Sequence, residues 1–204
     1  MRLLFATRSA GKQREVRRVL EAAGHTVLFP DEAGVPESPL ENSLEVADSF
    51  ETNARLKAEY FVKKTGLPTV ADDSGLEVFS LGGLPGVRSK RWANASGTPA
   101  QVDQANNTEL LRRLTGATNS RRRARYRCVL VLLRSEHGFP EVFEGVCGGL
   151  ILEAPRGDGG FGYDPLFLSD DLGKTFGEVD GEGKDRISHR GRALVRLLDH
   201  LGVA

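Results

Sequence analysis

Two long β-rich segments, 124–134 and 141–152, limit most strongly what this chain can fold into. Both consist mainly of apolar and β-forming residues, and the turn-like sequence His137-Gly138-Phe139-Pro140 lies between them. This pattern is typical of a hairpin, which is antiparallel. Because the N-terminal part of the chain shows a strand, loop and helix pattern, the sequence predicts an α/β protein with a mixed sheet.

The N-terminal pattern begins with an apolar run at residues 2–6. After it, Val16, Val19, Leu20 and Ala23 follow the i, i+3, i+4, i+7 spacing of one helix face, and Gly24 is placed to end that helix. The segment 27–29 predicts a second strand, stopped by Pro30. Residues 31–49 show no sustained period and predict a mobile or site-lining loop.

A second helix is predicted from Phe50 to Lys64, followed by a strand at 69–71. The sequence Asp72-Asp73-Ser74-Gly75 then lies at the carboxyl end of that strand, where α/β proteins usually bind ligands. Further helices are predicted around 100–114 and 191–201. No repeat or linker divides the chain, so we expect one domain over residues 1–204, with room for two lobes.

Composition restricts the classes of partner. The 204 residues contain 28 basic and 28 acidic side chains, so no net field would draw the chain to nucleic acid or to a membrane surface. The apolar run at the N-terminus is too short for a signal peptide, and a cytoplasmic protein is expected. Cys128 and Cys147 fall in strand-like runs without metal-ligand spacing, which predicts buried, inert thiols.

The first loop, Thr7-Arg8-Ser9-Ala10-Gly11-Lys12, joins a strand to a helix, and helix N-terminal amides favour an anion. It is not a P-loop, because Ala6 and Gln13 stand where that motif needs Gly and Ser or Thr. The Gly-Lys pair alone does not decide between a phosphate site and a plain loop with a solvated lysine.

The adjacent carboxylates of Asp72 and Asp73 are costly after an apolar strand unless they pair, bind metal or do acid–base work. Successive strand side chains point to opposite faces, so the two are expected to differ in role. One would hold Mg²⁺ or a water, and the other would anchor the loop. A turn without function is the structural alternative.

Three other segments offer ligand-binding chemistry, each with a plain structural alternative. Lys57 shares a helix face with Asn53. The sequence Phe161-Gly162-Tyr163-Asp164-Pro165 presents aromatic faces on a glycine-rich backbone that can approach a flat ring. Lys184 and Ser188-His189-Arg190 precede or begin the last helix, where Ser188 suits an N-cap and the two cations suit a carbonyl or phosphate oxygen.

The sequence Arg121-Arg122-Arg123, with Arg125 and Arg127 beyond it, is the feature that would suggest RNA or DNA. No interleaved aromatic residues or nucleic-acid motif accompany it. A solvated edge or a subunit contact is therefore the preferred interpretation.

Six motifs lie along the chain in a recognisable order and spacing: Ala6-Thr7-x-x-x-Gly11-Lys12, Phe50-Glu51-x-Asn53-Ala54-x-x-Lys57-Ala58, Ala71-Asp72-Asp73-Ser74-Gly75-Leu76, Leu81-Gly82-Gly83-x-Pro85-Gly86-Val87, Gly160-Phe161-Gly162-Tyr163-Asp164-Pro165 and Ser188-His189-Arg190-Gly191. Over almost the whole chain they resemble the inosine triphosphate pyrophosphatase family, also called XTP/dITP diphosphatases. One departure is Arg8-Ser9, where the family usually has Gly-Asn.

The resemblance implies an elongated, two-lobed α/β fold with a long central mixed sheet flanked by helices, an active-site cleft between the lobes, and a homodimer. It also implies an activity: metal-dependent hydrolysis of ITP, dITP and XTP to the monophosphate and pyrophosphate, with Mg²⁺, or Mn²⁺, as the cofactor.

The resemblance further implies residue roles. Asp73 would be the catalytic carboxylate and a metal ligand, with Glu45 as a second acidic group near the metal. Lys12, Lys57 and Lys184 would surround the phosphates, and Phe161 would stack on the base. The remaining implied contacts are the base-edge readers Asp164, His189 and Arg190, and the residues that complete the nucleotide pocket, Thr7, Arg8, Ser9, Ala10, Gly11, Ser74, Gly162 and Tyr163.

Two rival functions remain. The related Maf-type pyrophosphatases share a similar fold but prefer pyrimidine or modified nucleotides, and Phe161-Gly162-Tyr163-Asp164 argues against them. A nucleotide- or nucleic-acid-binding module would explain the lysines and arginines but not Asp72-Asp73. Measuring whether nucleotide binding depends on Mg²⁺, and whether pyrophosphate is released, would separate an enzyme from a binding module.

Overall fold

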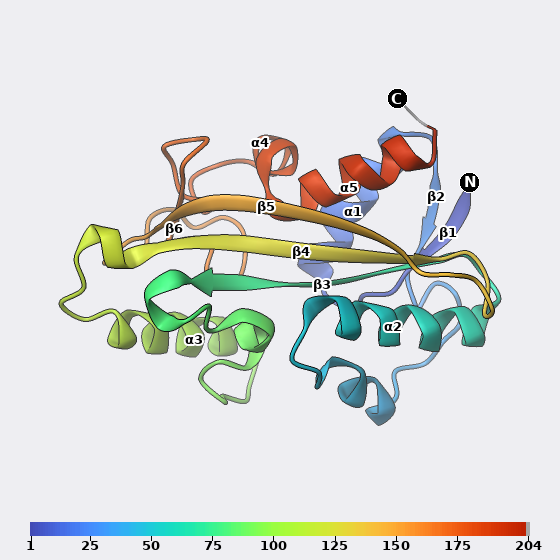
Figure 1. Cartoon of the computed structure of the whole chain (residues 1–204), viewed down its shortest axis with the longest axis horizontal. Coiled ribbons are helices and arrows are strands. Elements are labelled where there is room, and N and C mark those ends of the chain that lie inside the picture. Colours follow the sequence, from blue (N-terminus) through green and yellow to red (C-terminus); the bar gives the residue numbers. More distant parts are fainter. Residues whose placement is uncertain (203–204) are drawn as a thin grey trace. The chain divides into compact units, whose positions relative to one another are not determined.

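The computed structural model describes residues 1–202, in which strands and α-helices alternate as far as the fourth strand and are followed by two further strands and two helices. The strands and α-helices are β1 (Arg2–Phe5), α1 (Ala10–Ala22), β2 (Thr26–Leu28), α2 (Phe50–Thr65), β3 (Thr69–Val78), α3 (Pro99–Arg113), β4 (Arg123–Leu133), β5 (Glu141–Ile151), β6 (Phe167–Ser169), α4 (Gly181–Ile187) and α5 (His189–His200) (Figure 1). Four short 3₁₀ helices join them: η1 (Pro39–Glu45), η2 (Phe79–Leu81), η3 (Gly86–Arg91) and η4 (Asn119–Arg122).

The predicted mixed sheet is confirmed. Its six strands have the order β2-β1-β3-β4-β5-β6. Strand β1 pairs in parallel with both β2 and β3, whereas β5 pairs antiparallel with β6. The two long β-rich segments form β4 and β5, and these strands are neighbours, as the hairpin pattern predicts.

The chain divides into two compact units. Unit 1 comprises residues 1–73, 128–145 and 190–204, and unit 2 comprises residues 74–127 and 146–189. Strands β3, β4 and β5 each contribute residues to both units, so neither unit is one continuous stretch of sequence. A single domain over residues 1–204 stays a prediction, and residues 203 and 204 lie outside the described part.

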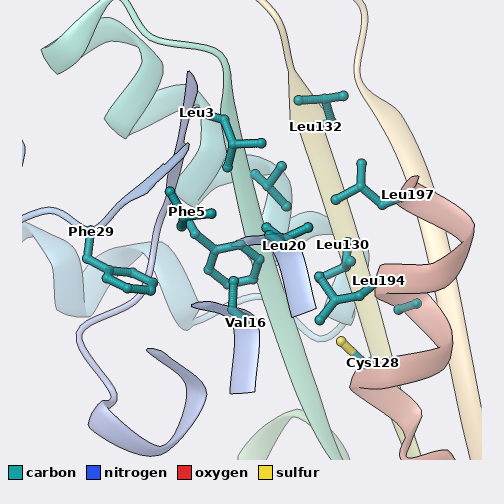
Figure 2. Packing of buried hydrophobic residues seen from close by; sticks show 13 residues of the cluster. Leu3, Phe5, Val16, Leu20, Phe29, Cys128, Leu130, Leu132, Leu194 and Leu197 are labelled. Atoms are coloured by element: carbon teal, nitrogen blue, oxygen red, sulfur yellow. The ribbon is translucent and has the colours of Figure 1, made fainter. Parts of the chain in front are cut away.

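Unit 1 has helices on both faces of its strands, and strand alternation decides which side chain meets which helix. Leu3 and Phe5 of β1 pack with α1 and α5, whereas Leu4 and Ala6 pack with α2. Figure 2 shows the first cluster, with the Phe5 ring beside Val16. Burying a leucine or phenylalanine side chain contributes roughly 1.5–3 kcal/mol, so these two clusters hold unit 1 together.

Unit 2 has its own core, formed by β3, α3, β4, β5 and the segment around β6. Leu110 of α3 and its C-cap Leu114 are buried there with Phe167 and Phe176. Helix α3 begins with a capping box in which the Thr98 hydroxyl and the Gln101 side chain each accept from the other's backbone N–H. The N-terminus of α3 is therefore capped, and its apolar side is anchored in the core of unit 2.

Several element predictions needed correction. The strand expected at 69–71 continues to Val78 as β3, so Asp72 and Asp73 lie within a strand. The segment expected to be irregular contains η1, which begins with a capping box between Ser38 and Glu41. Strand β6 and helix α4 were not predicted, because three and seven residues are too few to display a period.

Two compositional expectations can be compared with the structure. Both cysteines are buried and free, as predicted. Burial raises the pKa of the Cys128 thiol to about 12, which keeps it protonated and inert. No helix within residues 1–202 combines the length and the apolar character that crossing a bilayer requires.

Candidate active site

The loop after β1 presents an anion-binding helix terminus. Helix α1 begins at Ala10 with Ser9 as its N-cap, and the Ser9 side chain makes no capping hydrogen bond. The first turn also contains no acidic residue. The first-turn amides of Ala10, Gly11 and Lys12 therefore remain available to a phosphate, which the positive end of the helix dipole also favours.

Arg8 connects this loop to the acidic segment that contains η1. Its Nε and Nη2 donate to the two carboxylate oxygens of Glu41, each at 2.7 Å, and Nη2 also donates to the Val35 carbonyl at 3.1 Å. A further ion pair joins Arg8 to Asp31. The hydrogen bonding of Arg8 to the Glu41 carboxylate is the main reason why the pKa of Arg8 is raised. The structure thus gives Arg8 a fastening role, and its contact with a nucleotide stays a prediction.

Asp72 and Asp73 point to opposite sides of β3, as strand alternation predicts. Asp72 Oδ2 lies 2.9 Å from Lys12 Nζ and 3.3 Å from Arg190 Nε, on the side of α1 and α5. Asp73 Oδ2 accepts from Asn53 Nδ2 of α2 at 2.8 Å. The two carboxylates therefore have different surroundings and different chemistry.

Asp72 belongs to a buried charge network. Arg190, 2% exposed, forms ion pairs with both Asp72 and Glu15. Burial opposes ionisation of Asp72, but the charges of Lys12 and Arg190 outweigh it and hold its pKa well below the usual range. The same network raises the pKa of Arg190 despite its burial, through Glu15 and Asp72. Asp72 is thus a permanently charged anchor for Lys12 and Arg190.

Asp73 has the opposite shift. Burial, with a smaller contribution from Glu45, raises its pKa, while Lys57, Lys12 and the Asn53 hydrogen bond act against the rise. A carboxylate whose pKa is moved upward is a stronger base than a free aspartate. Asp73 therefore has the property that a general base requires.

Lys57 contacts one of the two acidic groups named for the metal, and its charge interacts with the other. Its Nζ is 2.7 Å from Glu45 Oε1 and also donates to the Asp72 carbonyl. Burial disfavours its charge, but Glu45, Asp72 and Asp73 more than compensate and raise its pKa. The ammonium is therefore charged and held beside Asp73.

The metal prediction rests on two oxygen donors. Glu45 and Asp73 are close enough for Glu45 to affect the Asp73 pKa, and carboxylate oxygens suit Mg²⁺. Within residues 1–202, no group of three or more His, Cys, Asp or Glu side chains is arranged to hold a metal ion. Because Mg²⁺ usually binds through one or two carboxylates plus substrate phosphates, this pair fits the ion.

Unit 2 contains a second group of predicted site residues. Lys184 Nζ forms a buried ion pair with Asp164 Oδ2 at 2.6 Å and lies 4.5 Å from the centre of the Phe161 ring. The Phe161 backbone N–H donates to the same Asp164 oxygen at 2.8 Å. Asp164 therefore fixes both the lysine and the loop that carries the aromatic ring.

His189 joins this group through an aromatic residue that sequence reasoning missed. The His189 ring stacks on Tyr126 of β4, with centroids 4.6 Å apart and planes 9° from parallel. The Tyr126 hydroxyl donates to Asp164 Oδ1 at 3.4 Å. Tyr126 thus links two predicted base-reading residues. The sequence did contain a signal: Tyr126 alternates with the arginines of β4, so its side chain faces the side of the strand opposite to theirs.

The predicted residues fall into two groups by unit. Unit 1 contains Thr7 to Lys12, Glu45, Lys57, Asp73 and Arg190. Unit 2 contains Ser74, Phe161, Gly162, Tyr163, Asp164, Lys184 and His189. Lys184 is therefore in the same unit as Phe161, whereas Lys12 and Lys57 belong to unit 1. Tyr163 is buried, and its hydroxyl donates to the Ser89 carbonyl at 2.8 Å, so its side chain supports the core.

The arginine cluster is mostly paired within unit 2. Arg123 makes two hydrogen bonds to Asp170, at 2.7 and 2.6 Å, and Arg125 pairs with Glu77 at 2.5 Å. Arg122, expected on a solvated edge, is instead buried and donates to backbone carbonyls, among them that of Leu114 at 2.8 Å. These contacts give the cluster a structural role.

A family comparison matches nearly the whole chain: the profile of the Ham1 family covers residues 3–200. Among curated proteins, a dITP/XTP pyrophosphatase of Thermus thermophilus is 45% identical over 98% of this chain and 91% of its own length. One of Geobacter sulfurreducens, with the same name, is 43% identical over 98% and 96%. The solved structure of a HAM1 protein from Coxiella burnetii has a TM-score of 0.85 and 35% identity, and the match covers 100% of both chains.

Proposed function

The chain belongs to the Ham1 family, and we propose that it hydrolyses ITP, dITP and XTP to the nucleoside monophosphate and pyrophosphate. The observation that carries this proposal is Asp73, a buried carboxylate with a raised pKa beside Lys57 and Asn53. The relatives named dITP/XTP pyrophosphatase support the choice of substrate. A homodimer acting in the cytoplasm is part of the proposal and rests on the resemblance.

We assign the phosphate chemistry to unit 1. A nucleoside triphosphate carries about four negative charges at neutral pH, so its binding and cleavage require cations and oriented N–H donors. Lys12, Lys57 and the first-turn amides of α1 supply these. Asp73 orients a water molecule for attack on phosphorus and accepts its proton, while Asn53 holds the carboxylate in place.

We propose Mg²⁺ as the cofactor, with Mn²⁺ as an alternative, held by Asp73 and Glu45 together with substrate phosphates. When bound, the ion neutralises charge on the phosphates and polarises the bond to the leaving pyrophosphate. Lys57 holds Glu45 at this site through an ion pair of 2.7 Å, and its positive charge acts on Asp73.

We assign recognition of the base to unit 2. Phe161 stacks on the ring, and His189 donates to the 6-oxo group of hypoxanthine or xanthine. Lys184 is assigned here too, because it contacts Asp164 and Phe161. Adenine has a 6-amino donor at that position, and a buried unpaired donor costs about 1–3 kcal/mol, which corresponds to roughly 10-fold to 100-fold rejection of ATP.

The test is pyrophosphate release from ITP, XTP, dITP, GTP, ATP and dTTP, measured with Mg²⁺ and with a chelator. We expect release from the inosine and xanthine nucleotides alone, and none in chelator. Release mainly from dTTP would favour a Maf-type enzyme. Binding without release in any condition would favour a nucleotide-binding module.

A further inference from the structure

Two side chains of α3 form hydrogen bonds with the backbone next to Phe161. The Gly162 N–H donates to Asp103 Oδ2 at 2.8 Å, and the Gly162 carbonyl accepts from Asn107 Nδ2 at 3.0 Å. Asp103 and Asn107 are four residues apart on one helix face, so from adjacent turns they reach the two peptide groups on either side of the Gly162 Cα. Gly162 has a φ of 63°, in the left-handed region that favours glycine.

Helix α3 is itself anchored. Leu110 in the helix and Leu114 at its C-cap are buried, and Asn106 hydrogen-bonds the helix to the segment before it. Asn106 Oδ1 accepts from the Ala93 N–H at 2.8 Å, and its Nδ2 donates to the Lys90 carbonyl at 3.1 Å. The two side chains that hold Gly162 therefore project from a helix that cannot easily shift.

The Phe161 loop is thus held at three consecutive peptide groups. Asp164 accepts from the N–H of Phe161, and the α3 pair binds Gly162. Next to it lies a cavity of about 480 Å³, lined among others by Asp103, Asn107, Phe161 and Gly162. Because this cavity adjoins Phe161, protein does not enclose the loop on every side, and the hydrogen bonds from α3 and Asp164 hold its backbone.

We propose that Asp103 and Asn107 are positioning residues that hold Phe161 for the purine base and so set affinity and base selectivity. This inference rests on the proposed function. An aromatic ring stacks well only when it is presented in one orientation, and every contact made without prior ordering costs conformational entropy. Loss of either hydrogen bond should therefore weaken binding of the base without altering the reacting phosphates.

The test compares Asn107→Ala and Asp103→Ala with the wild-type enzyme in steady-state hydrolysis of ITP and ATP. We expect KM for ITP to rise about 10-fold, with kcat changed less than about 3-fold, and the ITP over ATP preference to fall. Asp103→Asn keeps an oxygen acceptor and should restore most of the affinity. Arg112→Ala, at an exposed position on the same helix and not among the residues that line the cavity, is the matched control and should leave KM and selectivity unchanged.

A double-mutant cycle separates positioning from a general loss of structure. In a Phe161→Ala background, Asn107→Ala should raise KM by less than about 2-fold, because the ring through which it acts is gone. An effect as large as in the wild-type background would overturn the inference, as would an unchanged KM and selectivity in both alanine variants. If Asp103→Ala fails to fold by its melting temperature, Asn107→Ala decides alone. A wild-type protein that does not hydrolyse ITP would overturn the proposed function, and this inference with it.

Discussion

Replacement of Asp73 by asparagine is expected to lower kcat for ITP by about 10²-fold to 10⁴-fold while the fold is kept. The amide cannot accept the proton of the attacking water, although it can still receive the Asn53 hydrogen bond. Because burial raises the pKa of Asp73 in the folded protein, its ionised form costs stability at neutral pH. The melting temperature of the variant should therefore be unchanged or higher.

The matched control is the same substitution at the exposed Asp199, which should leave both kcat and melting temperature unaltered. A variant of Asp73 that retained more than about a tenth of the wild-type rate would remove this residue from the role of base. Circular dichroism of both proteins checks that any loss of rate is not a loss of structure.

The same substitution at Asp72 should have the reverse effect on stability and lower the free energy of unfolding. Asp72→Asn leaves Lys12 and Arg190 without their shared buried carboxylate, and breaking a buried charge network typically costs about 3–5 kcal/mol. We expect the lower end of that range, because Glu15 still pairs with Arg190. Against a total stability of about 5–15 kcal/mol, this loss is large. Denaturant unfolding at pH 7 measures it.

The pH dependence of that difference follows from the lowered pKa of Asp72. Its folded pKa lies below the unfolded value of 3.8, so its contribution is fully present above that pH and is lost as the pH falls through the folded value. The wild-type advantage over Asp72→Asn should thus be constant from neutral pH to about pH 5 and shrink on further acidification. Equal stabilities at pH 7 would contradict the anchoring role.

Local sequence patterns predicted those helices and strands that begin or end at a characteristic residue, such as an N-cap serine or a C-cap glycine. Helix α2 has Ser49 as an N-cap and ends at Gly66 in the left-handed conformation, and both residues are visible in the sequence. Strand alternation alone predicted that Asp72 and Asp73 would face different partners, and the structure confirms it. Short elements such as β6 gave no comparable signal.

Long-range partners could not be predicted in the same way. Arg190 meets Glu15 and Asp72 across 175 and 118 residues of sequence, and no local period relates them. A partial signal existed: Glu15 lies three residues after Lys12 and one before Val16, on the predicted apolar face of α1, which indicates a buried charge. The hydrogen bonds of Asp103 and Asn107 with Gly162 likewise join residues 59 and 55 positions apart, and they depend on how α3 packs in unit 2.

The most direct test of the central claim is ³¹P NMR of ITP incubated with the purified protein and Mg²⁺. We expect equal amounts of inosine monophosphate and pyrophosphate, with no diphosphate intermediate, because the attack falls between the α- and β-phosphates. Inosine diphosphate with orthophosphate, or ITP that persists unchanged while another nucleotide is consumed, would contradict it.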